Sequence, residues 1–250
     1  MIINDTHYLD KNTSISYTFY NCGEPVVVFL YGGMGEINKA TWDQIINKLT
    51  KNISYLVFDR PGIGLSKPSS LPRTASNFAA EFKSLIDSLG IKNIILVGHS
   101  IGGLYARYFA SKYSEYISSL ILLDATHENQ FERNSKFINI NELEKSYEMA
   151  NKNPEGMKIP EDPNKSFEQM RQFSKIPDSF HSIIIAAENS LPSVMPNSSE
   201  INKINIELQQ NLSNKSVNSE FLIAKNCSHF IYIDNPEIVI ESIQKVISNR

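Results

Sequence analysis

Six short apolar runs constrain the fold of this chain more than any other feature. Each run is rich in Val, Ile and Leu, and most are separated by stretches with helical periodicity. The runs cover residues 26–31, 55–59, 93–98, 119–124, 182–187 and 220–224. Continuously apolar runs of this length are typical of parallel strands buried on both faces. The pattern predicts an α/β fold with a mostly parallel central sheet and helices on both faces. An alternating stretch over residues 7–20 predicts a hairpin before the first of these strands.

Helical periodicity marks the crossovers between the strands. Helices are predicted over residues 41–50, 74–89, 101–113, 201–212 and 236–248. The last of them has Asn235 as its N-cap and Pro236 at the first helical position, and both residues suit a helix start.

A polar stretch interrupts the alternation between residues 127 and 177. It contains Pro154, Pro160, Pro163 and Pro177, and two amphipathic segments over residues 140–150 and 166–173. A segment this long is unlike a plain loop. We therefore predict one α/β core, formed by residues 1–126 and 178–250, with an inserted helical cap over residues 127–177.

Charge and composition exclude several classes of partner. The 250-residue chain has a formal net charge of −3 and no basic run, so neither nucleic acid nor an anionic membrane surface is expected as a partner. The N-terminus lacks the features of a signal peptide, and no stretch approaches the roughly 18 apolar residues of a spanning helix. We expect a cytoplasmic protein without membrane insertion. Metal-ligand spacing is absent, so no metal and no cofactor are expected, and no pattern indicates an oligomeric state.

The strongest chemical signal is the segment GHSIG over residues 98–102, which lies directly between a predicted strand and a predicted helix. In this context G-x-S-x-G presents a nucleophilic serine on a tight turn, and the glycines avoid clashes that a Cβ would cause. Ser100 is therefore the candidate nucleophile. The N–H of Ile101 at the helix start is a candidate donor to an oxyanion formed beside it.

A serine nucleophile needs a base, and the base needs an orienting acid. Among five histidines, His229 follows the last predicted strand, where a loop can reach over the edge of the sheet. Asp124 and Glu188 end the fourth and fifth apolar strands at that edge, where ligand-facing residues collect, so either can orient His229. Asp59 ends a strand before Ser100, and this chain order favours a turn-stabilising role for it.

A second donor to the oxyanion is expected from YGGMG over residues 31–35, where consecutive glycines let the backbone approach a substrate. Gly33 and then Met34 are the candidates. A phosphate-binding loop is disfavoured because no Lys-Ser/Thr pair and no G-x-G-x-x-G pattern is present.

Five segments in register resemble the α/β-hydrolase superfamily along nearly the whole chain. They read YGGMG, DRPGIGLS, GHSIGG, LLDATHENQ and SHFIYIDNPE. The first begins with Tyr31 where the family usually has His. The family's acid commonly follows the later of these two strands, the apolar run over residues 182–187, where this chain reads AENS. Some members place it one strand earlier, in a segment resembling LLD-x-x-H-E-x-Q, and Asp124 matches that pattern. The resemblance therefore favours Asp124 over Glu188 as the acid.

The resemblance implies a serine hydrolase acting on a carboxylic ester or a related small-molecule acyl substrate. Ser100, His229 and Asp124 would form its triad, and catalysis would pass through an acyl-enzyme. Amidase, thioesterase and peptidase activities use the same groups, so they stay open. So does a non-catalytic homologue that binds a small molecule.

Overall fold

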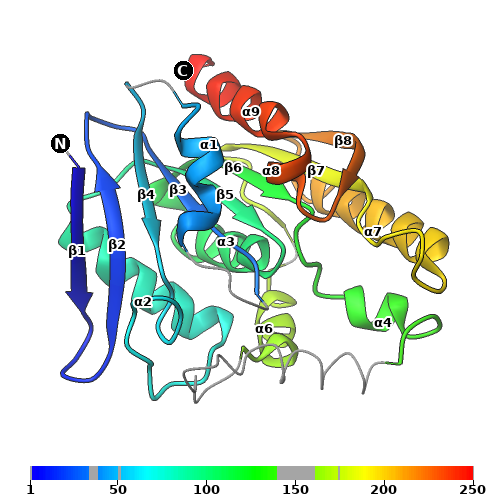
Figure 1. Cartoon of the computed structure of the whole chain (residues 1–250), viewed down its shortest axis with the longest axis horizontal. Helices are drawn as coiled ribbons and strands as arrows, with labels where there is room; N and C mark the ends of the chain where they lie inside the picture. Colours follow the sequence, from blue (N-terminus) through cyan, green and yellow to red (C-terminus); the bar gives the residue numbers. More distant parts are fainter. Residues whose placement is uncertain (1, 34–38, 50–51, 140–160, 174, 250) are drawn as a thin grey trace.

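A central eight-stranded sheet organises the computed structural model, which describes residues 2–33, 39–49, 52–139, 161–173 and 175–249. The strands are β1 (Ile2–Tyr8), β2 (Ser14–Tyr20), β3 (Val26–Leu30), β4 (Ser54–Phe58), β5 (Ile94–His99), β6 (Ile117–Leu123), β7 (His181–Asn189) and β8 (Ser219–Ser228). Their order across the sheet is β1-β2-β4-β3-β5-β6-β7-β8 (Figure 1). Strands β3 to β8 run parallel, whereas β1 and β2 form an antiparallel hairpin at one edge. The predicted sheet is confirmed, and so is the hairpin, although its first strand begins at Ile2, before the predicted residue 7.

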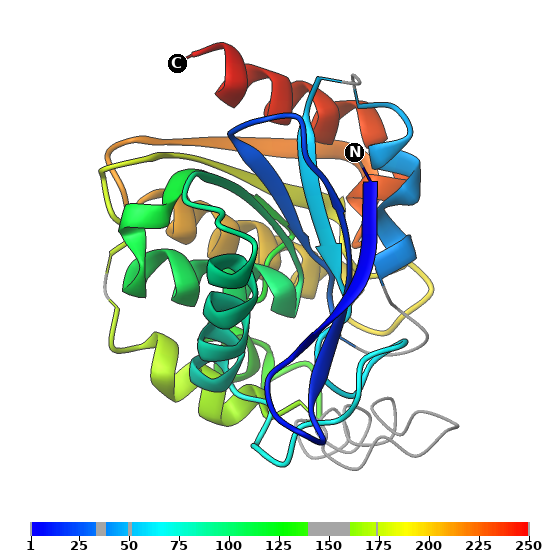
Figure 2. The ribbon, with the colours of Figure 1, turned by 90° about the vertical axis from the view of Figure 1, so that its left-hand side faces the viewer.

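Helices cover both faces of this sheet, as Figure 2 shows. They are η1 (Lys39–Trp42), α1 (Asp43–Ile46), α2 (Ala75–Ser88), α3 (Ile101–Lys112), η2 (Ser114–Tyr116), α4 (Gln130–Asn134), α6 (Pro163–Met170), α7 (Ser198–Ser213), α8 (Ile231–Asp234) and α9 (Pro236–Ser248). One core contains Val26, Val28 and Leu30 of β3 with side chains of α2, α3 and α6. The other contains Val27 and Phe29 with side chains of α1, α8 and α9. Because successive side chains of a strand point to opposite faces, a strand covered on both sides reads as one apolar run.

Most predicted helices lie where their sequence signals place them. Helix α9 begins at Pro236, and the side chain of Asn235 accepts the N–H of Ile238 at 3.3 Å. The helix predicted over residues 41–50 is shorter than expected. Residues after Ile46 form i−3 hydrogen bonds, such as Lys48 N–H to the Ile45 carbonyl at 3.0 Å, and these tighten the chain into a turn.

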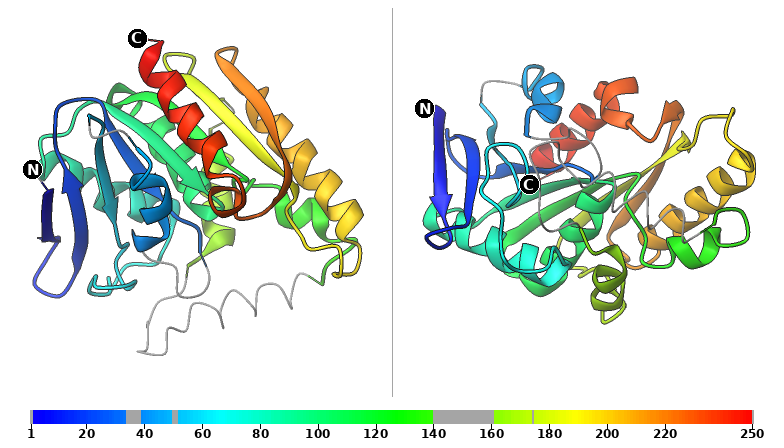
Figure 3. Two further views of the ribbon diagram at one scale, coloured as in Figure 1. Left: turned by 45° about the horizontal axis from the view of Figure 1, so that its top comes forward. Right: turned by 60° about the horizontal axis from the view of Figure 1, so that its bottom comes forward.

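Helices α4 and α6 are the described elements between residues 127 and 177. Helix α6 lies against α2 and α3 (Figure 3), where Ser166 Oγ accepts the Ala75 N–H at 3.1 Å. It begins before the predicted residue 166 because Asp162 caps it, accepting the Lys165 N–H at 2.8 Å, and Pro163 follows that cap. The helix predicted over residues 140–150 lies outside the described residues, and the assignment of residues 127–177 as a cap stays a prediction. Among the residues described, no helix is long and apolar enough to span a membrane.

Candidate active site

Ser100 lies at the junction of β5 and α3, and its backbone is strained. Its φ of 54° and ψ of −129° fall in a region that costs about 1–3 kcal/mol and persists only where the surroundings enforce it. Close packing around the turn enforces this backbone conformation. A Cβ on Gly98 would lie 2.7 Å from the Gly103 Cα, and one on Gly102 would overlap the Tyr31 carbonyl oxygen. The tight strand-to-helix turn that GHSIG predicts is therefore present, with Ser100 half-buried in it.

The side chains of His229 and Asp124 meet at the carboxyl edge of the sheet. His229 follows β8 and Asp124 follows β6, and His229 Nδ1 lies 2.6 Å from Asp124 Oδ2. The Asp124 Oδ1 accepts the N–H of Ala187 in β7 at 3.2 Å, which holds the carboxylate in place. A histidine that donates from Nδ1 to a carboxylate has Nε2 free to accept a proton.

Glu188 ends the neighbouring strand β7 but has other partners. Its Oε1 lies 2.8 Å from the Lys225 Nζ, and its Oε2 accepts the N–H of Asn226 at 2.8 Å. The Asn226 N–H and then Lys225 hold the pKa of Glu188 below its ordinary value. The structure therefore brings Asp124 to His229 and ties Glu188 to β8.

Two residues that sequence reasoning gave no role also contact this pair. Ser190 Oγ donates to Asp124 Oδ2 at 2.5 Å and lies 3.5 Å from His229 Nδ1. His99 Nε2 donates to the backbone carbonyl of His229 at 2.8 Å, and the two imidazole rings are 4.5 Å apart. Burial, and next the neighbouring His229, hold the pKa of His99 well below its ordinary value, so His99 is neutral. Two sequence signals could have identified these residues. Ser190 lies in AENS, where the family commonly has its acid, and His99 directly precedes Ser100.

The glycine loop after β3 runs alongside the turn at Ser100. A Cβ on Gly32 would lie 3.0 Å from Ser100 Cβ, and one on Gly33 would lie 3.2 Å from Ile101 Cγ2. The predicted donors Gly33 and Ile101 are thus neighbours, and Gly32, which directly precedes Gly33, adjoins Ser100. Met34, the other predicted donor, lies outside the described residues.

His127 and Glu128, in the segment LLDATHENQ, anchor the chain after β6. Glu128 lies 2.8 Å from Arg107 Nη2 and 2.5 Å from Lys215 Nζ. The Nδ1 of His127 accepts the Asn129 N–H at 3.0 Å, and its Nε2 lies 3.1 Å from an oxygen of Asn211. Burial lowers the pKa of His127 to about 4. With both ring nitrogens engaged, His127 serves the local structure.

Asp59 organises the loop after β4. Its Oδ1 accepts the N–H of Lys39 at 2.7 Å, and its Oδ2 accepts the N–H of Leu65 at 3.3 Å. Gly64, with a φ of 55°, packs directly against this carboxylate. Asp59 is therefore a turn residue and not a partner of His229. Within the described ranges, no cluster of three or more His, Cys, Asp or Glu side chains could hold a metal ion.

Comparison with known proteins places this chain in a family. A family model described as the alpha/beta hydrolase fold matches residues 25–183. The chain therefore belongs to the α/β-hydrolase fold family, as its five sequence segments imply.

Individual relatives are similar over part of their length. The chain is 32% identical over 129 residues to a protein of Saccharomyces cerevisiae named an uncharacterized vacuolar membrane protein, covering 50% of this chain and 19% of that protein. It is 35% identical over 125 residues to the abhydrolase domain-containing protein abhd-5.2 of Caenorhabditis elegans, covering 46% and 28%. The chain thus spans less than a third of the length of these curated relatives.

A solved structure supports the fold over nearly the full chain. The meta-cleavage product hydrolase CumD of Pseudomonas fluorescens superposes with a TM-score of 0.71, covering 99% of both chains at 18% sequence identity. At this identity the likeness concerns the fold alone.

Proposed function

We propose that this protein is a serine hydrolase that acts on a carboxylic ester or a related small-molecule acyl compound. The contact of 2.6 Å between His229 and Asp124 carries the proposal, because it joins residues 105 positions apart at the sheet edge where Ser100 lies. The strained backbone at Ser100 and the adjoining glycine loop support it. Membership of the α/β-hydrolase family supports a hydrolase in general.

In the proposed mechanism, Ser100 Oγ attacks the substrate carbonyl carbon while His229 Nε2 takes the hydroxyl proton. Asp124 holds the imidazole through Nδ1 and stabilises the imidazolium. The N–H groups of Ile101 and Gly33, with Met34 as the further candidate, donate to the oxyanion. His229 then returns the proton to the leaving group. A water molecule, deprotonated by His229, releases the acid from the acyl-enzyme.

Amides, thioesters and peptides are alternative substrates because the same groups serve every acyl transfer. We favour esters over amides and peptides because an ester is the less demanding acyl substrate. A non-catalytic homologue that binds a small molecule is a different class of function. A fluorophosphonate probe separates that class from the enzymes, since it labels only an activated serine.

The first test is hydrolysis of p-nitrophenyl esters from acetate to palmitate by wild type and Ser100→Ala. We expect turnover by wild type, loss of at least about 10⁴-fold in Ser100→Ala, and fluorophosphonate labelling of wild type alone. Ser111→Ala, in the same helix α3, is the matched control and keeps full activity. Substantial turnover by Ser100→Ala would refute the nucleophile, and an unlabelled wild type without esterase activity would favour the binding protein.

A second test addresses the acid. Asp124→Asn is expected to lower kcat by about 10⁴-fold, because the amide favours the wrong imidazole tautomer. Glu188→Gln, bound to Lys225 and Asn226, is expected to stay within about threefold of wild type, which is the range of a surface substitution. Steady-state kinetics of the two isosteric variants would reverse the assignment if Glu188→Gln were the inactive one.

A further inference from the structure

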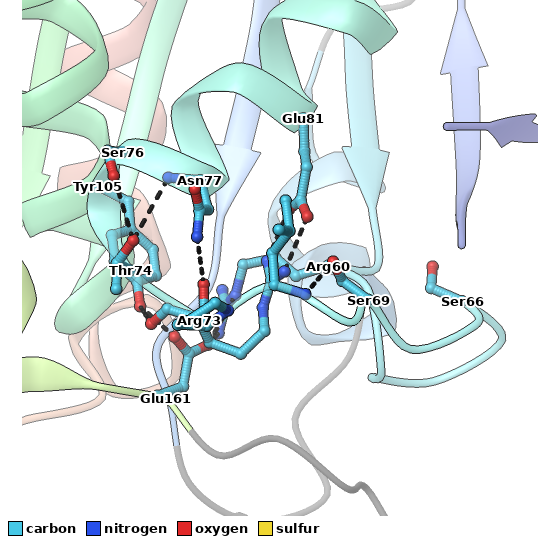
Figure 4. A network of polar contacts seen from close by, with 12 residues as sticks. Arg60, Ser66, Ser69, Arg73, Thr74, Ser76, Asn77, Glu81, Tyr105 and Glu161 are labelled. Atoms are coloured by element: carbon cyan, nitrogen blue, oxygen red, sulfur yellow. Dashed lines mark hydrogen bonds and ion pairs between the residues drawn. The ribbon is translucent and has the colours of Figure 1, made fainter. Parts of the chain in front are cut away.

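A buried arginine lies behind the glycine loop that adjoins Ser100. Arg60 directly follows Asp59 and is 1% exposed (Figure 4). A buried guanidinium is costly unless its donors are bonded. Its partners therefore indicate what a positive charge does at this position.

One side of the guanidinium binds two successive backbone carbonyls of the loop. Arg60 Nη1 donates to the Tyr31 carbonyl at 2.8 Å, and Nη2 donates to the Gly32 carbonyl at 2.9 Å. A planar fork of donors can hold two acceptors in one fixed geometry, which a lysine ammonium cannot do.

Other groups hold the guanidinium in place. Arg60 Nε donates to Glu161 Oε1 at 3.1 Å, and the hydroxyl of Tyr105 donates to Glu161 Oε2. The ring of Tyr31 lies 4.5 Å from the Arg60 Cζ, and its hydroxyl accepts the Arg60 N–H at 3.1 Å. Burial opposes the charge most strongly, but Glu161, Tyr31 and Tyr105 together outweigh it, and the pKa of Arg60 lies above its ordinary value. Tyr31, which replaces the family's usual His, thus packs on the same arginine.

Peptide planarity connects these contacts to the oxyanion. In a trans peptide the C=O and N–H point in opposite directions, so a donor bound to the Gly32 carbonyl turns the Gly33 N–H away from Arg60. Consecutive glycines would otherwise let this peptide rotate. A rotated peptide would present a carbonyl oxygen to the oxyanion and repel it.

We propose that Arg60 is a positioning residue, which clamps the carbonyls of Tyr31 and Gly32 so that the Gly33 N–H stays directed at the oxyanion. Glu161 compensates the buried charge of Arg60 and holds its guanidinium in one orientation. The inference rests on the proposed serine hydrolase function, and it adds residues for which that mechanism has no role.

The test compares two buried ion pairs in full-length protein. The Arg60→Met/Glu161→Gln double variant removes the clamp without leaving an unpaired charge. The matched control is Arg73→Met/Glu81→Gln, because Arg73 and Glu81 form a buried bidentate pair at 2.7 and 2.8 Å. Each variant is assayed for kcat and KM on the preferred ester, and for inhibition by a trifluoromethyl ketone that forms a tetrahedral adduct with Ser100.

We expect the clamp variant to lose about 10²-fold in kcat and as much affinity for the ketone, which is the effect of losing one oxyanion donor. Its KM should change by less than about threefold, because the donor acts mainly in the transition state. The control pair should keep wild-type kcat and ketone affinity. Arg60→Lys, which keeps the charge but loses the fork, should fall between clamp variant and wild type.

Equal kcat and ketone affinity in the clamp and control variants would overturn the inference while leaving the serine hydrolase intact. A wild type without turnover or ketone inhibition would instead refute the proposed function. Should the double variant not fold, Arg60→Lys decides the question, and wild-type kcat in that variant refutes the clamp.

Discussion

At the residue scale, Asp124 and Ser190 differ from the arrangement that is usual in the family. The family's acid commonly follows the strand that corresponds to β7. Here Asp124 follows β6, one strand earlier, and Ser190 follows β7. Ser190 Oγ is 2.5 Å from Asp124 Oδ2 and 3.5 Å from His229 Nδ1. A carboxylate at position 190 is therefore within reach of the same imidazole nitrogen.

This proximity predicts that the acid can be moved between strands. In an Asp124→Asn background, Ser190→Asp should restore at least about tenfold of the lost kcat, because a carboxylate beside Nδ1 again selects the working tautomer. Asn189→Asp in the same background is the control, since residue 189 is exposed, and it should restore nothing. Ester hydrolysis by the three variants measures the effect. Equal activity of both double variants would show that position 190 cannot replace Asp124.

At the element scale, the site depends on how closely α3 approaches β3. Gly102 allows the helix to begin directly against the end of β3 and its following loop, while Gly98 and Gly103 let α3 pack closely on β5 and on Ala125 after β6. The approach places the first N–H groups of α3, whose positive dipole end favours an oxyanion, beside Ser100. The same packing enforces the positive φ of Ser100.

A methyl group at residue 102 should therefore destabilise this junction. Gly102→Ala would overlap the backbone carbonyls of Leu30 and Tyr31. We expect a loss of about 1–3 kcal/mol in the free energy of unfolding, although alanine in a helix otherwise gains about 1 kcal/mol over glycine. Gly33→Ala, whose Cβ would meet a methyl group of Ile101 at 3.2 Å, should lose less than about 1 kcal/mol. Urea denaturation measures both, and equal stability of the two variants would contradict the packing argument.

At the scale of the whole molecule, the fold buries several charged and titratable groups. Arg60, Arg107 and Glu128 are almost wholly buried and paired, and His99 and His127 are buried and neutral. Neutral buried histidines link stability to pH, because these side chains bind protons in the unfolded chain at a pH where they do not in the folded chain.

Stability should consequently fall as the pH drops below about 6.5, the ordinary histidine pKa. The pKa of His127 is lowered to about 4, so its contribution is complete above pH 6.5 and decreases toward pH 4. It amounts to about 2 kcal/mol lost by pH 5. His127→Gln should flatten the dependence of the urea midpoint on pH between 7.5 and 5 relative to wild type. Identical slopes in wild type and His127→Gln would disprove the linkage.

The sequence by itself determined the strands, most helices and the turn at Ser100, because these depend on local periodicity and on residues adjacent in the chain. It also predicted that His229 and a strand-end carboxylate lie at one edge of the sheet. It favoured Asp124 over Glu188 as the acid only through the family resemblance, since a strand end specifies an edge of the sheet but not the direction of a side chain. Only the tertiary structure brought Asp124 and Ser190 to His229 and tied Glu188 to Lys225.

The contacts of Arg60 depend even more on tertiary structure than those of Asp124 do. Its partners lie 28 to 101 residues away along the chain, and they include backbone carbonyls and a glutamate within the segment predicted as a cap. No local pattern encodes such contacts. Three-dimensional packing decided them, because a buried guanidinium is stable only where the fold brings acceptors from distant segments around it.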